Sequence, residues 1–285
     1  MSDHSSRLNA EHPTTPDLLQ YHTHTRPGDL AELCLIVGAQ GRAQMIAHSF
    51  LESPKFFANP HRGLVSATGK YHGLRVSVTT SGMGGASTAI VLPEAVRSGA
   101  RMFIRVGSCG SLIPEAAPGD AVITTAAIRF DGASNNWAPP EFPAVAHWKV
   151  VSALVQAAAA HQGSGKAYVG VECTTDDFYA GQGRPDLWNE VPERAAKRHE
   201  EVLRLGAASY SMEAATLFVW CATQGRGLPA GAISAVFANR HTKAWGTLGE
   251  ERASVIALDA LLLLSQDRKF MEELGNTQIP ERSLR

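Results

Sequence analysis

Short runs of apolar and β-branched residues recur along this chain and limit most strongly how it can fold. Several of them, such as Met102–Val106, show little polar alternation, which is typical of central strands covered on both faces. The candidate strands are Leu33–Val37, Leu74–Thr80, Met102–Val106, Ala121–Thr125, Tyr168–Cys173 and Ala230–Val236. Helical patterns between many of them span Ala86–Ser98, Val145–His161, Val191–Leu205, Met212–Gln224 and Glu250–Gln266. This alternation predicts a three-layer α/β fold.

No shift in composition marks a linker within the 285 residues, so we expect a single domain over residues 21–285. Residues 1–20 are polar and contain prolines but no apolar segment, so we predict a mobile tail there and no signal peptide. The apolar run Val255–Leu264 is interrupted by Asp259 and is too short to span a bilayer. We therefore interpret it as a core helix.

The balance of charge restricts the possible partners. The chain has 26 Lys and Arg against 27 Asp and Glu, which argues against a nucleic-acid surface or an anionic membrane and favours small molecules. The cysteines are far apart and form neither a CxxC pair nor a metal-ligand spacing; they are Cys34, Cys109, Cys173 and Cys221. We expect reduced thiols in a cytoplasmic protein that has no metal site.

The segment Phe178–Arg184 carries polar groups suited to a flat heterocycle. Gln182 and Arg184 are two residues apart, and in an extended segment they would project to the same side. An amide and a guanidinium together can satisfy two carbonyls and an N–H, as on the edge of a pyrimidine. The alternative is a glycine-rich surface loop whose polar side chains are solvated.

Arg105 places a guanidinium inside or at the carboxyl end of a buried strand. A buried charge needs a carboxylate partner or a bound anion, and ligands of α/β sheets collect at the carboxyl ends of strands. Ser108 follows in a glycine-flanked turn that suits phosphate oxygens. The alternative is an internal ion pair with Asp120 or Asp131.

Two further glycine turns follow candidate strands. Ser81–Ser87 resembles a phosphate-binding loop, but GxGxxG fails at Ser87, which disfavours a dinucleotide site. The turn after the first strand contains Gly38 and Arg42, and Arg62 comes after a loop. Each of these arginines could be an ordinary surface residue, or they could converge with the strand arginine on one dianion.

Met212 and Glu213 begin a predicted helix that is almost uncharged up to Gln224. A glutamate in the first turn can act merely as a partner of the helix dipole. Alternatively, its carboxylate could bind the vicinal hydroxyls of a sugar, with the flexible methionine against the ring. Arg240 follows the last candidate strand and so also lies at a carboxyl end.

Six stretches in order resemble the nucleoside phosphorylase family, and within it the uridine phosphorylases. They are Ser81–Thr88, Phe103–Gly110, Arg129–Ser134, Ala138–Val145, Phe178–Arg184 and Met212–Leu217. The resemblance extends over about residues 20 to 240. It implies a single α/β/α domain with a central mixed sheet, and an oligomeric enzyme, dimeric or hexameric, whose active sites are shared between subunits.

The resemblance also implies roles for individual residues. In the phosphate site it places Gly38, Arg42, Arg105 and Ser108, together with Arg62 from a neighbouring subunit. Inorganic phosphate would be a second substrate, and no cofactor is implied.

For the base, the resemblance places Gln182 and Arg184 as the reading pair, Phe178 as a packing ring, and Arg240 near the far carbonyl of uracil. For the ribose it places a pair within this subunit and a pair sent by a partner subunit. These are Met212 and Glu213 from this subunit, and Tyr21 and His22 from the partner.

The implied reaction is phosphorolysis of a pyrimidine nucleoside to the free base and ribose 1-phosphate, without a covalent intermediate. Arg105, Gln182, Arg184 and Glu213 would be catalytic. Purine-cleaving relatives commonly carry an aspartate near the last strand, where this chain has Asn239–His241, which favours pyrimidines. The alternatives are a purine nucleoside phosphorylase, a nucleosidase, or a nucleoside-binding protein without turnover.

Several positions depart from the family pattern. Ala39–Gly41 replaces an Asp-Pro-Asp sequence, and Ser211 stands where a glutamate commonly precedes the Met-Glu pair. Gly63 stands where bacterial uridine phosphorylases have a glutamate that helps to hold a monovalent cation, so we predict no potassium site. Gly183 replaces an acidic residue, and the flap segment His241–Glu250 matches poorly.

Overall fold

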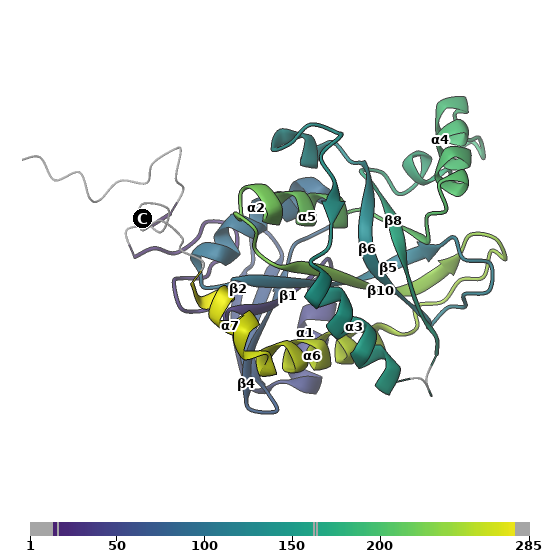
Figure 1. The fold of residues 1–285 in the computed structure, drawn as a ribbon. Coiled ribbons are helices and arrows are strands. Elements are labelled where there is room, and N and C mark those ends of the chain that lie inside the picture. Colours follow the sequence, from purple (N-terminus) through teal and green to yellow (C-terminus); the bar gives the residue numbers. More distant parts are fainter. Residues whose placement is uncertain (1–13, 16, 162, 164, 277–285) are drawn as a thin grey trace, which may run out of the picture.

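The computed structural model describes residues 14–15, 17–161, 163 and 165–276. Within them, one mixed sheet has helices on both faces, which confirms the predicted α/β class (Figure 1). The strands are β1 (Leu33–Val37), β2 (Glu52–Asn59), β3 (Leu64–Tyr71), β4 (Leu74–Thr80), β5 (Met102–Ser111), β6 (Ala121–Phe130), β7 (Ala144–Val145), β8 (Ala167–Thr175), β9 (Ser209–Ser211) and β10 (Ala230–Asn239).

Two groups of helices enclose the sheet. The helices are α1 (Gln40–Phe50), α2 (Gly84–Arg97), α3 (Trp148–Ala160), α4 (Glu193–Arg204), α5 (Ala214–Thr223), α6 (Glu250–Gln266) and α7 (Arg268–Gly275). Helices α2 and α5 lie on one face, and α1, α3, α6 and α7 lie on the other (Figure 1). Each group packs apolar side chains against the sheet, so the core consists of two layers.

Half of the sheet closes on itself. Strand β5 pairs with β10, β10 with β6, β6 with β8, β8 with β9, and β9 again with β5. Four strands continue outward from β5 in the order β1, β4, β3 and β2, and the short β7 pairs with β6. A closed ring has no free edge, and residues on its inner side are surrounded by strands.

The predicted strands are confirmed. Leu33–Val37 and Leu74–Thr80 have the predicted bounds, and the other four run longer. The sequence reasoning missed α1, α7, β2, β3, β7 and β9. Glycines at the start of α1 concealed that helix, although the buried faces of Ala43, Ile46 and Ala47 have helical spacing.

Four predicted helix starts were wrong. Helix α2 begins at Gly84 rather than at Ala86. Ala144–Val145 pairs with β6 as a strand, so α3 begins only at Trp148. Helix α4 begins after Pro192 because the residue before a proline is disfavoured in helical conformation. Helix α5 begins at Ala214, and Glu213 occupies its N-cap position with non-helical angles.

The predicted tail of residues 1–20 lies mostly outside the described residues. At its end, Gln20 is buried, and its backbone N–H donates to the carbonyl of Thr25 at 2.9 Å. In the described part of the chain, no helix combines the length and apolar character needed to cross a membrane.

Candidate active site

A cavity of about 470 Å³ opens where β1 and β4 end, beside the second halves of β5 and β10. Its position agrees with the general placement of ligand sites at the carboxyl ends of strands. It brings together most of the predicted site residues. Those lining it are Gly38, Arg42, Arg105, Ser108, Phe178, Gln182, Arg184, Met212 and Glu213.

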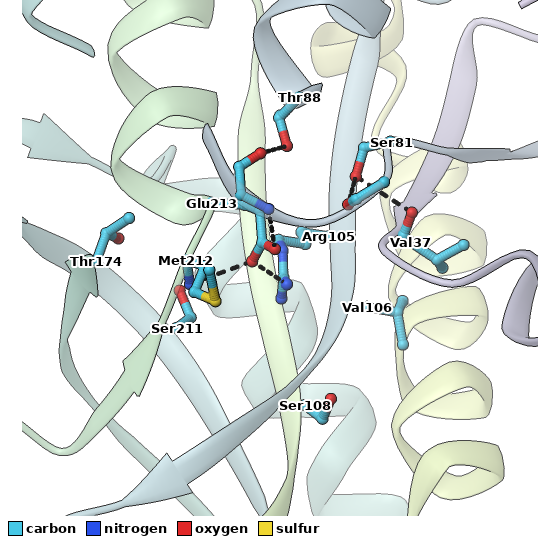
Figure 2. A network of polar contacts seen from close by, with 12 residues as sticks. Val37, Ser81, Thr88, Arg105, Val106, Ser108, Thr174, Ser211, Met212 and Glu213 are labelled. Atoms are coloured by element: carbon cyan, nitrogen blue, oxygen red, sulfur yellow. Dashed lines mark hydrogen bonds and ion pairs between the residues drawn. The ribbon is translucent and has the colours of Figure 1, made fainter. Parts of the chain in front are cut away.

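The centre of the cavity is a buried ion pair. Arg105 on β5 donates through Nη2 to the carboxylate of Glu213, and the two side chains are 7% and 6% exposed. Figure 2 shows them side by side, with Ser211 and Met212 next to the carboxylate. The alternative partners Asp120 and Asp131 are therefore not the partners of this guanidinium.

Glu213 is held from a second side by the glycine loop that follows β4. The backbone N–H of Gly84 donates to Glu213 Oε1 at 2.9 Å. This loop, Ser81–Ser87, therefore positions a carboxylate in this structure.

The ion pair leaves part of the guanidinium unused. Nε and Nη1 of Arg105 are buried and have no hydrogen-bond partner among the described residues. Burying unsatisfied donors costs free energy, so a site of this kind favours an acceptor-rich ligand.

Arg42 lies in the first turn of α1 and reaches the same cavity. It donates to the backbone carbonyl of Val106 at 3.0 Å and contacts Ser108 Oγ at 3.5 Å. Its Nη2 also pairs with Glu250 Oε1 at 2.5 Å. Like Arg105, it has a buried Nε without a partner in the described residues. Two predicted phosphate ligands thus converge beside the predicted serine.

Gln182 and Arg184 lie together in the cavity lining, but the local conformation differs from the extended segment that was predicted. Ala180–Gln182 is a turn of 3₁₀ helix, so the expected extended segment was wrong. Arg184 turns back to donate to Gln182 Oε1 and to the backbone carbonyl of Phe178. Its guanidinium carbon lies 3.8 Å from the centre of the Phe178 ring. The aromatic ring, amide and guanidinium therefore form one group.

Burial, followed by the nearby Arg240 charge, lowers the pKa of Arg184 to about 10. A lowered pKa means that the protein surroundings disfavour the cation. A ligand that carries negative charge beside Arg184 would offset this cost.

Gly183 is required where it stands. It has φ of +63°, and a Cβ there would lie 2.7 Å from Cβ of His199. An acidic side chain between Gln182 and Arg184 would therefore be strained and would collide with α4.

Arg240 lies behind this loop and does not line the cavity. It donates to the carbonyls of Gln182 at 2.8 Å and Gly183 at 3.3 Å. In this structure it supports the segment Phe178–Arg184 from outside.

Three residues predicted to act from a partner subunit form a separate cluster outside the cavity. Arg62 donates to the hydroxyl of Tyr21 at 3.2 Å and lies over its ring. His22 Nδ1 lies 2.7 Å from Glu94 Oε1. Tyr21 is 49% exposed. The structure places all three together but not with the phosphate or base residues of the same chain.

Comparison with known proteins agrees with this geometry. The model of the phosphorylase superfamily matches residues 32–261. The chain belongs to the phosphorylase superfamily. It is 38% identical to the uridine phosphorylase of Thermococcus kodakarensis over 269 residues, which is 94% of this chain and 95% of the relative.

Two further members of the phosphorylase superfamily are similar over much of the chain. The uridine phosphorylase of Escherichia coli is 38% identical over 223 residues, or 77% of this chain and 86% of the relative. A DeoD-type purine nucleoside phosphorylase of Roseobacter denitrificans is 34% identical over 207 residues, or 72% and 82%.

The sequence analysis did not predict several residues that line the cavity of this protein. Met83, Tyr210, Phe237 and Trp245 also line it. Trp245 comes from the poorly matching flap segment and forms an isolated β-bridge with Ala238. Phe237 was detectable in principle as the residue after a predicted strand. Met83 lies in the glycine turn Ser81–Ser87 and Trp245 in the flap segment, whereas nothing local marks Tyr210.

Gly107 leaves room for the guanidinium of Arg105. A Cβ on Gly107 would lie 1.6 Å from Arg105 Nη1, whereas a Cβ on Gly41 would meet nothing within 4 Å. We expect Gly107→Ala to displace the guanidinium and to raise the KM for phosphate about tenfold, the loss of one charge-assisted contact.

The matched control is Gly41→Ala, which lies next to Arg42 and should leave the KM for phosphate unchanged. Steady-state kinetics at varied phosphate, with thermal unfolding of both variants, would measure this. An unchanged KM in folded Gly107→Ala would contradict the role of Arg105.

Proposed function

We propose that this chain is a pentosyltransferase that cleaves uridine or a related pyrimidine nucleoside with inorganic phosphate, giving the free base and ribose 1-phosphate. The observation that carries the proposal is the pair of buried guanidiniums with unsatisfied N–H groups, Arg42 and Arg105, in one cavity with a base-reading group. The two uridine phosphorylases named above support this choice.

The phosphate would bind between Arg42, Arg105 and Ser108. Charge-assisted hydrogen bonds contribute about 1.5–3 kcal/mol each, and a dianion has enough oxygens for all the free donors. Glu250 pairs with Arg42 and, at its side chain's 37% exposure, can be solvated when phosphate takes its place. No cofactor is needed in this proposal, because phosphate itself is the nucleophile.

The ribose would lie beside Met212, with its hydroxyls on Glu213. As the glycosidic bond lengthens, the sugar gains oxocarbenium character and is stabilised by the phosphate dianion and this carboxylate. No covalent intermediate is required. Arg105 and Gly84 hold the carboxylate in place, so it is already oriented when the nucleoside binds.

The departing pyrimidine would carry its negative charge to Gln182 and Arg184. The protein surroundings disfavour the charge of Arg184, so an anionic leaving group is better stabilised there than a neutral base. The side-chain NH2 group of Asn239 lies within hydrogen-bond distance of three backbone carbonyls of residues 113–116, and the residue is 1% exposed. It is thus engaged in structure, and this position offers no carboxylic acid to protonate a purine.

The test is base release from uridine, thymidine and inosine, with and without phosphate. We expect phosphate-dependent release of uracil, with inosine much slower. Release without phosphate would indicate a nucleosidase, faster release from inosine a purine enzyme, and saturable uridine binding without turnover a binding protein.

A substitution of Arg42 tests where the phosphate binds. Arg42→Met keeps the aliphatic stem and removes the partner of the partly exposed Glu250 carboxylate and of the Val106 carbonyl. We expect it to raise the KM for phosphate about 10- to 100-fold, the equivalent of one lost charge-assisted contact. The KM for uridine should change little in the same assay, and an unchanged KM for phosphate would place the anion elsewhere.

Subunit sharing is also part of the proposal. Tyr21, His22 and Arg62 cluster away from their own cavity and are partly exposed, so they are available to the site of a second copy. We propose a homo-oligomer, dimer or hexamer, acting on nucleoside and phosphate in the cytoplasm. The four free, buried cysteines support a reducing compartment.

Mixed oligomers test the sharing. Arg62→Ala protomers would lack the residue they send to a partner, and Gln182→Ala protomers would lack their own base contact. Hybrids should regain one complete site, giving roughly a quarter of wild-type activity if isologous dimers pair at random. Activity no higher than the mean of the two parents would show that Arg62 acts within its own subunit.

A further inference from the structure

Glu172 is a buried carboxylate to which neither the proposed mechanism nor the sequence motifs give a role. It lies in the middle of β8, within the closed ring of strands, and is 0% exposed. It forms no ion pair among the described residues. Burying a carboxylate costs free energy unless hydrogen bonds replace the water that it loses.

Hydroxyl groups from three strands surround this carboxylate. Thr124 on β6 donates to Oε2 at 2.8 Å, and Thr174 on β8 donates to Oε1 at 3.3 Å. Ser211 on β9 donates to Oε1 as well. A carboxylate can accept all three bonds without offering a donor of its own.

Two of these hydroxyls hold the segment that carries Met212 and Glu213. Ser211 immediately precedes the segment, and Thr174 accepts a hydrogen bond from the backbone N–H of Ala215 just after it, at 3.0 Å. Thr174 and Ser211 are also paired in the register of β8 and β9. One carboxylate oxygen therefore fixes both ends of a short segment at the start of α5.

Met212 and Glu213 face the cavity, so a shift of either end of their segment would move them relative to the ligand. Figure 2 shows Thr174 and Ser211 to the left of Glu213 and Arg105 to its right. Arg105 and Gly84 orient the tip of the Glu213 side chain. The hydroxyls bonded to Glu172 orient its backbone.

We infer that Glu172 is a positioning residue that holds Glu213 for the ribose hydroxyls through Ser211 and Thr174. Burial raises the pKa of Glu172 above its ordinary value, and the hydrogen bond from Ser211 and the charge of Arg105 act in the opposite direction, in favour of the carboxylate. The inference rests on the proposed function, since it assigns the ribose contact to Glu213.

The first test compares Glu172→Gln with the wild type on uridine and on 2′,3′-dideoxyuridine, which lacks the hydroxyls that Glu213 would bind. Misplacement of a positioning group costs on the order of 10- to 100-fold, so kcat/KM for uridine should fall by about that factor. The value for dideoxyuridine should change less than twofold. A purely structural role would lower both equally, and that result would overturn the inference.

An exchange variant guards against simple loss of folding. Ser211 Oγ and the Glu172 carboxylate are in direct contact, so Glu172→Ser combined with Ser211→Glu returns a carboxylate and a hydroxyl to the same small volume. We expect this double variant to recover most of the preference for uridine over dideoxyuridine. Recovery of thermal stability without recovery of the preference would contradict a positioning role.

A second buried carboxylate, away from the cavity, serves as a control. It separates the effect of losing any buried carboxylate from the effect of losing one at the position of Glu172. Asp120 is buried and accepts backbone N–H bonds from Ala117 and Lys166, away from the cavity. Asp120→Asn should lower the melting temperature but leave the uridine preference unchanged. If the wild type turns over neither nucleoside, the proposed function fails; dissociation constants of uridine and dideoxyuridine from calorimetry then decide the inference on Glu172 by the same comparison.

Discussion

The buried ion pair between Arg105 and Glu213 is the interaction on which the rest of the site depends. Its two members are 108 positions apart in sequence, one on a central strand and the other at the N-cap of α5. Removing one partner of such a pair typically costs about 3–5 kcal/mol, because the other charge remains buried and unpaired. The fold must therefore hold β5 and the start of α5 in a fixed relation, and the part of the cavity that they line is fixed with them.

The same constraint explains features that are not themselves catalytic. Gly107 has no side chain because Arg105 occupies that space, and Gly84 donates its backbone N–H to the Glu213 carboxylate. Glu172 satisfies the hydroxyls beneath the segment that carries Glu213. The Glu213 carboxylate accepts hydrogen bonds from Arg105, Gly84 and Met212. Two nitrogens of Arg105 remain buried without a partner among the described residues, and an anion can bind there.

Much of the fold was predictable because burial leaves a local signal. Continuous apolar runs located six strands, but the short β9, the largely exposed β2 and β3, whose buried residues include serine, threonine and glycine, have no such pattern. At the site, the pairing of Gln182 with Arg184 was predicted from an extended segment, whereas a 3₁₀ turn and a left-handed Gly183 produce it. Asp120 and Asp131 were weighed as partners of Arg105 because sequence spacing cannot reveal which carboxylate a strand will meet.

The sequence by itself determined the α/β class, the placement of polar residues at strand ends, and the residue types that suit phosphate, sugar and base. Only the tertiary structure decided that Arg105 pairs with Glu213 and that Arg240 donates to the backbone of the Phe178–Arg184 segment. It also decided that Tyr21, His22 and Arg62 lie outside the cavity of the same chain. The physical reason is the distance along the sequence over which each signal acts. Periodicity and turn residues report on neighbours within a few positions, whereas pairing between distant groups depends on how the strand ring closes and which helices cover it.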